Sequence, residues 1–148
     1  MVIGIIGENC SGKSTLAKKI AETLGGEVMS GKDYLRMAKS ESEAKLLFRK
    51  KLNGAVSGSN VIYVISELDH VQLLPDGAVR ILVSADIDTI KERFRARMHG
   101  NLPAPVAAML EKKHGMFDGG SYDYRFDGVN GDPDALAAAL RKAAENES

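Results

Sequence analysis

Eight residues near the amino end, residues 7–14 with the sequence GENCSGKS, combine residue types that can bind the phosphates of a nucleotide. Two glycines separated by four residues let the main chain curl and turn its N–H groups toward an anion. Lys13 supplies a positive charge for the β- and γ-phosphates, and the Ser14 hydroxyl supplies an oxygen ligand for magnesium. The motif predicts a phosphate loop with ATP and Mg²⁺ as cofactors, bound by Gly7, Asn9, Cys10, Ser11, Gly12, Lys13, Ser14 and Thr15.

The segments on either side of this loop are those that such a motif requires. Val2–Ile6 is an apolar run, typical of a strand buried on both faces of a parallel sheet. Behind the loop, Leu16, Ala17 and Ile20 recur at helical spacing, and Gly25 offers a stop. The loop therefore leads into a helix N-terminus, whose unpaired N–H groups attract phosphate. The alternative is a glycine-rich turn that contains Lys-Ser by chance.

The remainder of the chain alternates predicted strands with predicted helices. Further strands are expected at 27–29, 61–65, 79–83 and 122–129. A capping box of Ser40 and Glu43 starts one helix, Asp86 caps another, a third runs over about 104–116, and the last begins at Pro133. Right-handed crossovers then give an α/β fold, a three-layer α/β/α sandwich with a five-stranded parallel sheet. The prediction is a single domain over residues 1–148 with the P-loop NTP hydrolase fold, whose ligands bind at the carboxyl ends of the strands.

Two arginines in the helix that follows Asp86 could act on a phosphoryl group. Arg93 and Arg97 are four residues apart and share one flank of that helix. The apolar stripe beside them comprises Ile87, Ile90, Phe94 and Met98. Two fixed guanidinium groups stabilise the charge that spreads over the oxygens of a transferring phosphoryl group. The alternative is a solvated basic face with acidic partners nearby.

Two segments beyond the loop resemble a known family. Residues 29–36, MSGKDYLR, resemble the Ile-Ser-Thr-Gly-Asp-x-Leu-Arg segment that follows the second strand of adenylate kinases. Residues 90–97 are similar to the Arg-x-x-x-Arg segment that precedes the lid in that family. The chain thus resembles the small adenylate and cytidylate kinase-like P-loop kinases. The resemblance implies that Arg36 binds the phosphate of the acceptor.

Two positions make the resemblance incomplete or ambiguous. After the third strand, Ser66 stands where adenylate kinases have an aspartate, and their arginine is missing. Glu67 or Asp69 can replace that carboxylate, since a shifted carboxylate still reaches magnesium through water. Asp33 either orients the acceptor, or holds magnesium through water, or caps a helix.

These features predict a kinase that transfers the γ-phosphoryl group of Mg-ATP to a nucleoside monophosphate, a nucleoside or a similar small acceptor. The expected catalytic residues are Lys13, Arg93, Arg97 and Asp33, and the expected acceptor-binding residues are Arg36, Asp33 and Glu67. The acceptor region is expected over about 32–56 and a short lid over about 99–105. Two alternatives stay open: a non-catalytic, regulatory nucleotide-binding module, and a kinase for a non-nucleotide metabolite.

The composition excludes some classes of binding partner. Twenty basic residues balance twenty acidic ones in 148 residues, which argues against a general nucleic-acid binder. Apolar runs such as 61–65 are far too short to cross a bilayer, and one cysteine cannot form an internal disulfide. We expect a cytoplasmic protein whose partner is a small phosphate acceptor, with no sequence feature that indicates an oligomer. The three histidines share no site pattern and are interpreted as surface residues, and Cys10 as a small residue that fits a tight turn.

Overall fold

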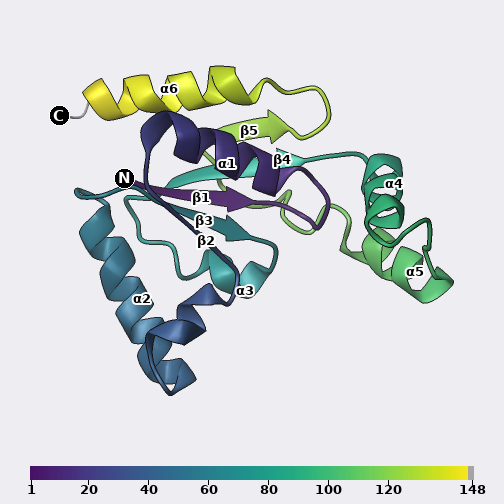
Figure 1. Ribbon diagram of the computed structural model, residues 1–148, viewed down its shortest axis with the longest axis horizontal. Coiled ribbons are helices and arrows are strands. Elements are labelled where there is room, and N and C mark those ends of the chain that lie inside the picture. The colour runs from purple at the N-terminus through teal and green to yellow at the C-terminus, as the bar shows by residue number, and fades with distance from the viewer. Residues whose placement is uncertain (147–148) are drawn as a thin grey trace.

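The computed structural model describes residues 1–146 and consists of a parallel sheet with helices on both faces (Figure 1). The strands are β1 (Val2–Ile6), β2 (Glu27–Ser30), β3 (Val61–Ile65), β4 (Val79–Ser84) and β5 (Tyr124–Asp127). Their order across the sheet is β2-β3-β1-β4-β5, and every neighbouring pair is parallel. This confirms the predicted α/β fold with a five-stranded parallel sheet.

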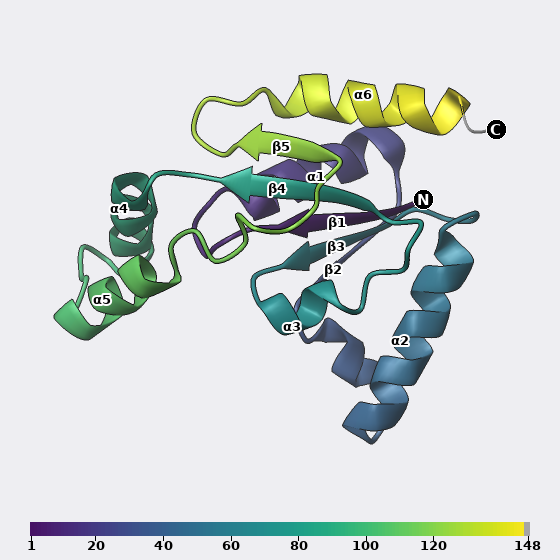
Figure 2. The same ribbon diagram turned by 180° about the vertical axis from the view of Figure 1, so that it is seen from behind.

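Helices cover the two faces of the sheet separately. Helices α1 (Lys13–Leu24) and α6 (Pro133–Asn146) lie on one face, and α2 (Glu41–Ala55) and the short α3 (Leu68–Val71) lie on the other (Figures 1 and 2). Side chains of β1 alternate accordingly: Ile3 and Ile5 pack with α1 and α6, whereas Val2 and Ile6 pack with α2. The central strand is therefore buried on both sides, as its apolar run predicts.

The predicted helix signals act where they were expected. Ser40 precedes α2 and accepts a hydrogen bond from the Glu43 N–H at 3.2 Å. Asp86 precedes α4 (Ile87–Arg97) and accepts from the Thr89 N–H at 2.9 Å, and this bond together with one from the Thr89 hydroxyl lowers the pKa of the Asp86 carboxyl. Gly25 ends α1 with a positive φ of 75°. Each signal is a local backbone bond, which is why the sequence alone reveals it.

Some predicted boundaries are wrong. Helix α5 (Ala104–Lys113) ends three residues before the predicted end at 116, because His114 is extended with a ψ of 128° and Gly115 follows with a φ of 82°. The last strand is β5 over 124–127 rather than 122–129. It stops because the Asp127 carboxylate accepts the N–H groups of Val129 and Asn130 and turns the chain. Met98, predicted in the buried stripe of α4, is 49% exposed because the helix ends at Arg97.

Two short helical segments were not predicted. Residues Asp33–Met37 form a 3₁₀ helix, η1, and α3 is a single turn after β3. Both are too short for hydrophobic periodicity to indicate them. Together with α2 they cover the sheet face that contains Tyr63.

Helices α4 and α5 form a helical arm, residues 87–113, that projects beyond the carboxyl end of β4 (Figures 1 and 2). A small apolar cluster of Cys10, Ala85, Ile90 and Leu110 joins the base of the arm to the chain that follows β1. The Lys91–Glu111 ion pair connects its two helices. Within residues 1–146, no helix combines the length and the apolar character needed to span a membrane.

Candidate functional site

The phosphate loop, residues 7–14, turns from β1 into α1 at the carboxyl edge of the sheet. The Gly7 N–H donates to the Ile65 carbonyl at 3.1 Å, and the Ser11 N–H donates to the Glu8 carbonyl at 3.2 Å. Gly12 has a φ of 110°, which L side chains rarely adopt. The predicted curl is therefore present, and a glycine is required where the loop enters the helix.

Lys13 is held inside this loop. Its ammonium donates to the Glu8 carbonyl at 2.6 Å, and the residue is only 6% exposed. Burial, with a smaller contribution from the nearby Arg97, lowers the pKa of Lys13 to about 8 against opposing effects of Cys10 and Glu8. The ammonium is thus charged at neutral pH and bonded only to a neutral carbonyl, which a phosphate oxygen can replace.

This pKa predicts how nucleotide affinity depends on pH. Below about pH 8 Lys13 already carries its proton, so affinity should be constant there. Above it, binding a polyanion requires uptake of a proton, and affinity should fall by up to about tenfold per pH unit. Calorimetric titration of ATP at about pH 7 and about pH 9.5 measures the change, and Lys13→Met should abolish it. Equal wild-type affinity at both pH values would contradict this role of Lys13.

Arg93 clamps three segments together. Its Nη1 donates to the Cys10 carbonyl at 3.1 Å, and its Nη2 donates to the Gly128 carbonyl at 2.8 Å. Helix α4, the phosphate loop and the turn after β5 are thereby fixed to one another. The side chain of Cys10 is buried beside them, which agrees with its interpretation as a small packing residue.

Removal of this clamp should loosen the site. We expect Arg93→Ala to lower the free energy of unfolding by about 2 kcal/mol, because two partly buried carbonyls lose a charged donor. ATP affinity should fall in parallel. The matched control is Arg95→Ala, since Arg95 pairs with Glu92 on the exposed side of the same helix and should cost less than about 0.5 kcal/mol. Urea unfolding measures the loss of unfolding free energy in both variants. An equal loss in the two would exclude a clamp at Arg93.

Two cavities meet over the phosphate loop. The first, about 330 Å³, lies between the loop, α4 and the turn after β5, and Thr15, Phe126, Val129 and Pro133 form part of its wall. The second, about 290 Å³, lies between the loop and the ends of β2 and β3. Its wall comprises Asn9, Cys10, Gly12, Lys13, Ser14, Ser30, Gly31, Val64, Ser66 and Arg97. Arg97 and Gly12 border both cavities, so a phosphoryl group passing between them would cross the loop beside Arg97.

All three predicted acceptor-binding residues lie outside the wall of the second cavity. Asp33 accepts the Ser30 N–H at 2.8 Å and so turns the chain after β2. Arg36 is exposed on η1. Glu67 is exposed, with its Oε2 3.9 Å from His70 Nε2. The structure brings Lys13, Arg93 and Arg97 together but leaves these three outside the cavity walls, and their roles stay predictions.

Ser14 is the predicted magnesium ligand. Ser14 is exposed at the start of α1 and borders the second cavity beside Lys13. Among the described residues, no group of three or more His, Cys, Asp and Glu side chains is arranged to hold a metal ion. Mg²⁺ bound with a nucleotide takes only one or two protein ligands, and phosphate oxygens and water supply the rest. The residues present therefore fit a magnesium ion that arrives with ATP and neutralises charge on its phosphates.

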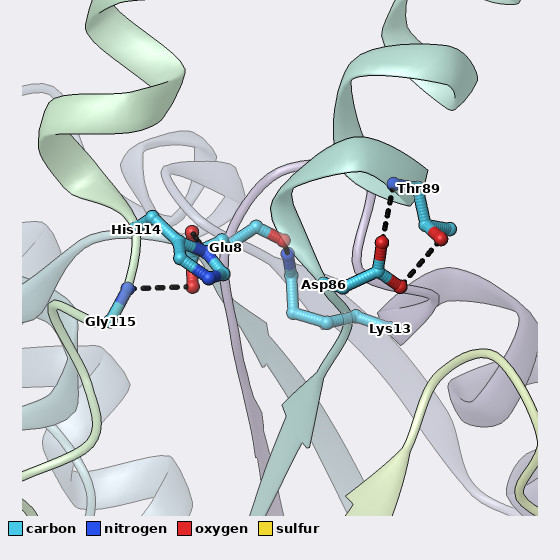
Figure 3. A network of polar contacts seen from close by, with 6 residues as sticks. All are labelled: Glu8, Lys13, Asp86, Thr89, His114 and Gly115. Atoms are coloured by element: carbon cyan, nitrogen blue, oxygen red, sulfur yellow. Dashed lines mark hydrogen bonds and ion pairs between the residues drawn. The ribbon is translucent and has the colours of Figure 1, made fainter.

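Sequence reasoning missed two histidines. His114 is exposed, as predicted, but its contact with Glu8 was not foreseen: its Nδ1 lies 3.0 Å from Glu8 Oε1 (Figure 3). The prediction that His70 is a surface residue is wrong. His70 is buried, with its ring 6.1 Å from that of Tyr34 and 6.3 Å from that of Tyr63, and its Nδ1 has no hydrogen-bond partner within residues 1–146. Since 106 residues separate His114 from Glu8, no local signal could have revealed their contact.

The sheet order, the phosphate loop and the two cavities define the fold of the small P-loop kinases. No family model and no curated protein matches the chain. Solved structures of that fold do. A gluconokinase from Sinorhizobium meliloti is 16% identical over 99% of this chain and 97% of its own, with a TM-score of 0.63. The shikimate kinase of Acinetobacter baumannii, in complex with shikimate, is 15% identical over 99% of this chain and 94% of its own, with a TM-score of 0.64.

A third similar structure contains a nucleotide. The YorR protein of Bacillus subtilis, in complex with phosphorylated GDP, is 23% identical over 99% of this chain and 97% of its own, with a TM-score of 0.61. These likenesses span the chain and establish its fold. They do not single out the adenylate kinase family that residues 29–36 resemble.

Proposed function

We propose that the chain is a kinase that transfers the γ-phosphoryl group of Mg-ATP to a small acceptor. The observation that carries this proposal is the junction of the two cavities beside Lys13 and Arg97. ATP occupies the first cavity, with its phosphates over the loop, and the acceptor occupies the second. Lys13 and the loop N–H groups hold the donor phosphates, and Arg97 neutralises the transferring group. The similar gluconokinase and shikimate kinase structures support the reaction class.

The wall of the second cavity favours one kind of acceptor. Its polar side chains are Asn9, Lys13, Ser14, Ser30, Ser66 and Arg97, and within the described chain no carboxylate borders it. A hydroxyl acceptor must lose its proton during transfer, which calls for a general base. A phosphate acceptor is already ionised at neutral pH and is attracted by the two cations. We therefore place a nucleoside monophosphate ahead of a nucleoside or a sugar.

An acceptor panel tests this function. ATP turnover is measured with nucleoside monophosphates, nucleosides, gluconate and shikimate. We expect turnover with at least one monophosphate and none with the hydroxyl acceptors. Turnover with hydroxyl acceptors alone would overturn the choice of acceptor, and Asp33→Asn would then show whether Asp33 is the base. Absence of ATP binding by the folded protein would overturn the whole proposal.

A second candidate is a nucleotide-binding module without catalysis. The observation that favours it is Ser66, which stands at the end of β3 where adenylate kinases have an aspartate, while Glu67 is exposed outside the cavity. This candidate predicts tight ATP binding, no turnover with any acceptor, and no effect of Glu67→Gln. The kinase proposal expects similarly tight ATP binding, but with ATP turnover in the presence of at least one acceptor of the panel.

A further inference from the structure

Glu8 contacts two parts of the site through different atoms (Figure 3). Its carbonyl accepts the Lys13 ammonium at 2.6 Å. Its carboxylate accepts from His114 Nδ1 at 3.0 Å and from the Gly115 N–H at 3.1 Å. Only 14% of the Glu8 side chain is exposed, and His114 and Gly115 directly follow α5. Glu8 therefore joins the phosphate loop to the carboxyl end of the helical arm.

The presence of this charge in a phosphate loop requires an explanation. A carboxylate repels the phosphates that the loop binds, so a glutamate at this position costs affinity unless its charge is directed elsewhere. Here the side chain points away from the loop interior, and two donors compensate it (Figure 3). Two bonds to one carboxylate fix both distance and direction. The geometry of Glu8 thus suits attachment of the arm rather than phosphate binding.

Besides the apolar cluster of Cys10, Ile90 and Leu110, two polar attachments hold the arm to the phosphate loop. Near its start, Arg93 binds the Cys10 carbonyl, and at its end His114 binds Glu8. Arg97 lies between these attachments and borders both cavities. The apolar cluster fixes no direction by itself, so loss of either polar attachment would loosen the orientation of the arm on the loop. The position of Arg97 over the loop then depends on Glu8 as well as on Arg93.

We propose that Glu8 is a positioning residue that holds Arg97 at the junction of the two cavities by fastening the carboxyl end of the helical arm. This inference rests on the proposed function, because the partner of Arg97 is the phosphoryl group in transfer. Glu8 itself borders neither of the two cavities. Its effect passes through His114 and Gly115 to the arm and from there to Arg97.

Hydrogen exchange in the absence of nucleotide tests the attachment directly. Glu8→Ala and His114→Ala should each raise amide exchange rates across residues 98–113 by about tenfold or more, because the end of the arm is released. Glu8→Gln should have a smaller effect, since its amide oxygen still accepts the Gly115 N–H. The control is Glu92→Ala, which removes an exposed carboxylate paired only within α4. His114 is more exposed than Glu8, so its variant is the safer one for folding.

A double-mutant cycle tests the positioning of Arg97. Arg97→Ala should weaken ATP binding about tenfold in the wild-type chain and less than about threefold in the Glu8→Ala and His114→Ala backgrounds. A merely structural Glu8 would leave the Arg97 penalty the same in every background. An equal penalty, or unchanged exchange, overturns the inference. If the wild-type chain does not bind ATP, the proposed function fails, and the exchange result alone decides whether Glu8 fastens the arm.

Discussion

Replacement of Lys13 by methionine is expected to weaken ATP binding about 100-fold and yet to stabilise the fold. Lys13 is the one cation buried in the phosphate loop among the described residues, and a charged hydrogen bond to phosphate in a dry site contributes about 2–3 kcal/mol. Its pKa, lowered from 10.5 to about 8, means that burial of the ammonium costs the folded protein about 3 kcal/mol. Calorimetric ATP titration and urea unfolding measure the two effects.

The stability gain has a defined pH window. The folded-state pKa lies below the unfolded one, so the unfolded chain binds the extra proton between about pH 8 and pH 10.5. The free-energy cost of burying the Lys13 ammonium is therefore complete below pH 8 and vanishes above pH 10.5. The gain in unfolding free energy of Lys13→Met should disappear over the same range. The matched control is Lys18→Met on the exposed side of α1, which should leave both quantities nearly unchanged. A destabilised Lys13→Met variant, or one with wild-type affinity, would contradict the assignment.

Local signals in the sequence were sufficient to predict the fold class and the phosphate loop. Strands β1 and β3 are apolar runs. Ser40 and Asp86 each cap a helix by accepting the backbone N–H of the residue three positions later. Gly12 has a positive φ, which favours glycine at that position. Each depends on neighbours in sequence, so pattern and spacing reveal it. Right-handed crossovers restrict the possible strand orders without fixing one, and the order β2-β3-β1-β4-β5 comes from the structure.

The walls of the site depend on contacts between distant residues, which the sequence does not encode locally. Glu8 and His114 are 106 residues apart, and Arg93 and Cys10 are 83 apart. A matching motif also leaves detail open: Asp33 fits the adenylate kinase segment, and its carboxylate accepts the backbone N–H of Ser30, while its role toward an acceptor stays a prediction. Position in a motif predicted which segments meet at the cavities, but not which atoms face them.

Gly128→Ala is expected to separate the turn after β5 from the phosphate loop. A Cβ atom at Gly128 would overlap the Ser11 carbonyl oxygen and lie 3.1 Å from the Ser84 carbonyl oxygen, and both are backbone atoms that cannot rotate away. The Gly128 N–H also binds Ser84 at 2.7 Å, and its carbonyl accepts from Arg93. The methyl group must therefore displace several bonds at once, and we expect a loss of about 3 kcal/mol in unfolding free energy.

Nucleotide affinity should fall about 100-fold in the same variant, because the turn forms one wall of the first cavity and its displacement shifts Arg93 and the curl of the phosphate loop. Gly119→Ala is the matched control, since a Cβ there meets no atom within 4 Å and its φ is not positive. Urea unfolding and ATP titration of the two variants separate a specific contact from a general effect of glycine replacement. If Gly128→Ala behaves like Gly119→Ala, the turn after β5 does not pack on the loop, and the first cavity cannot be the ATP site.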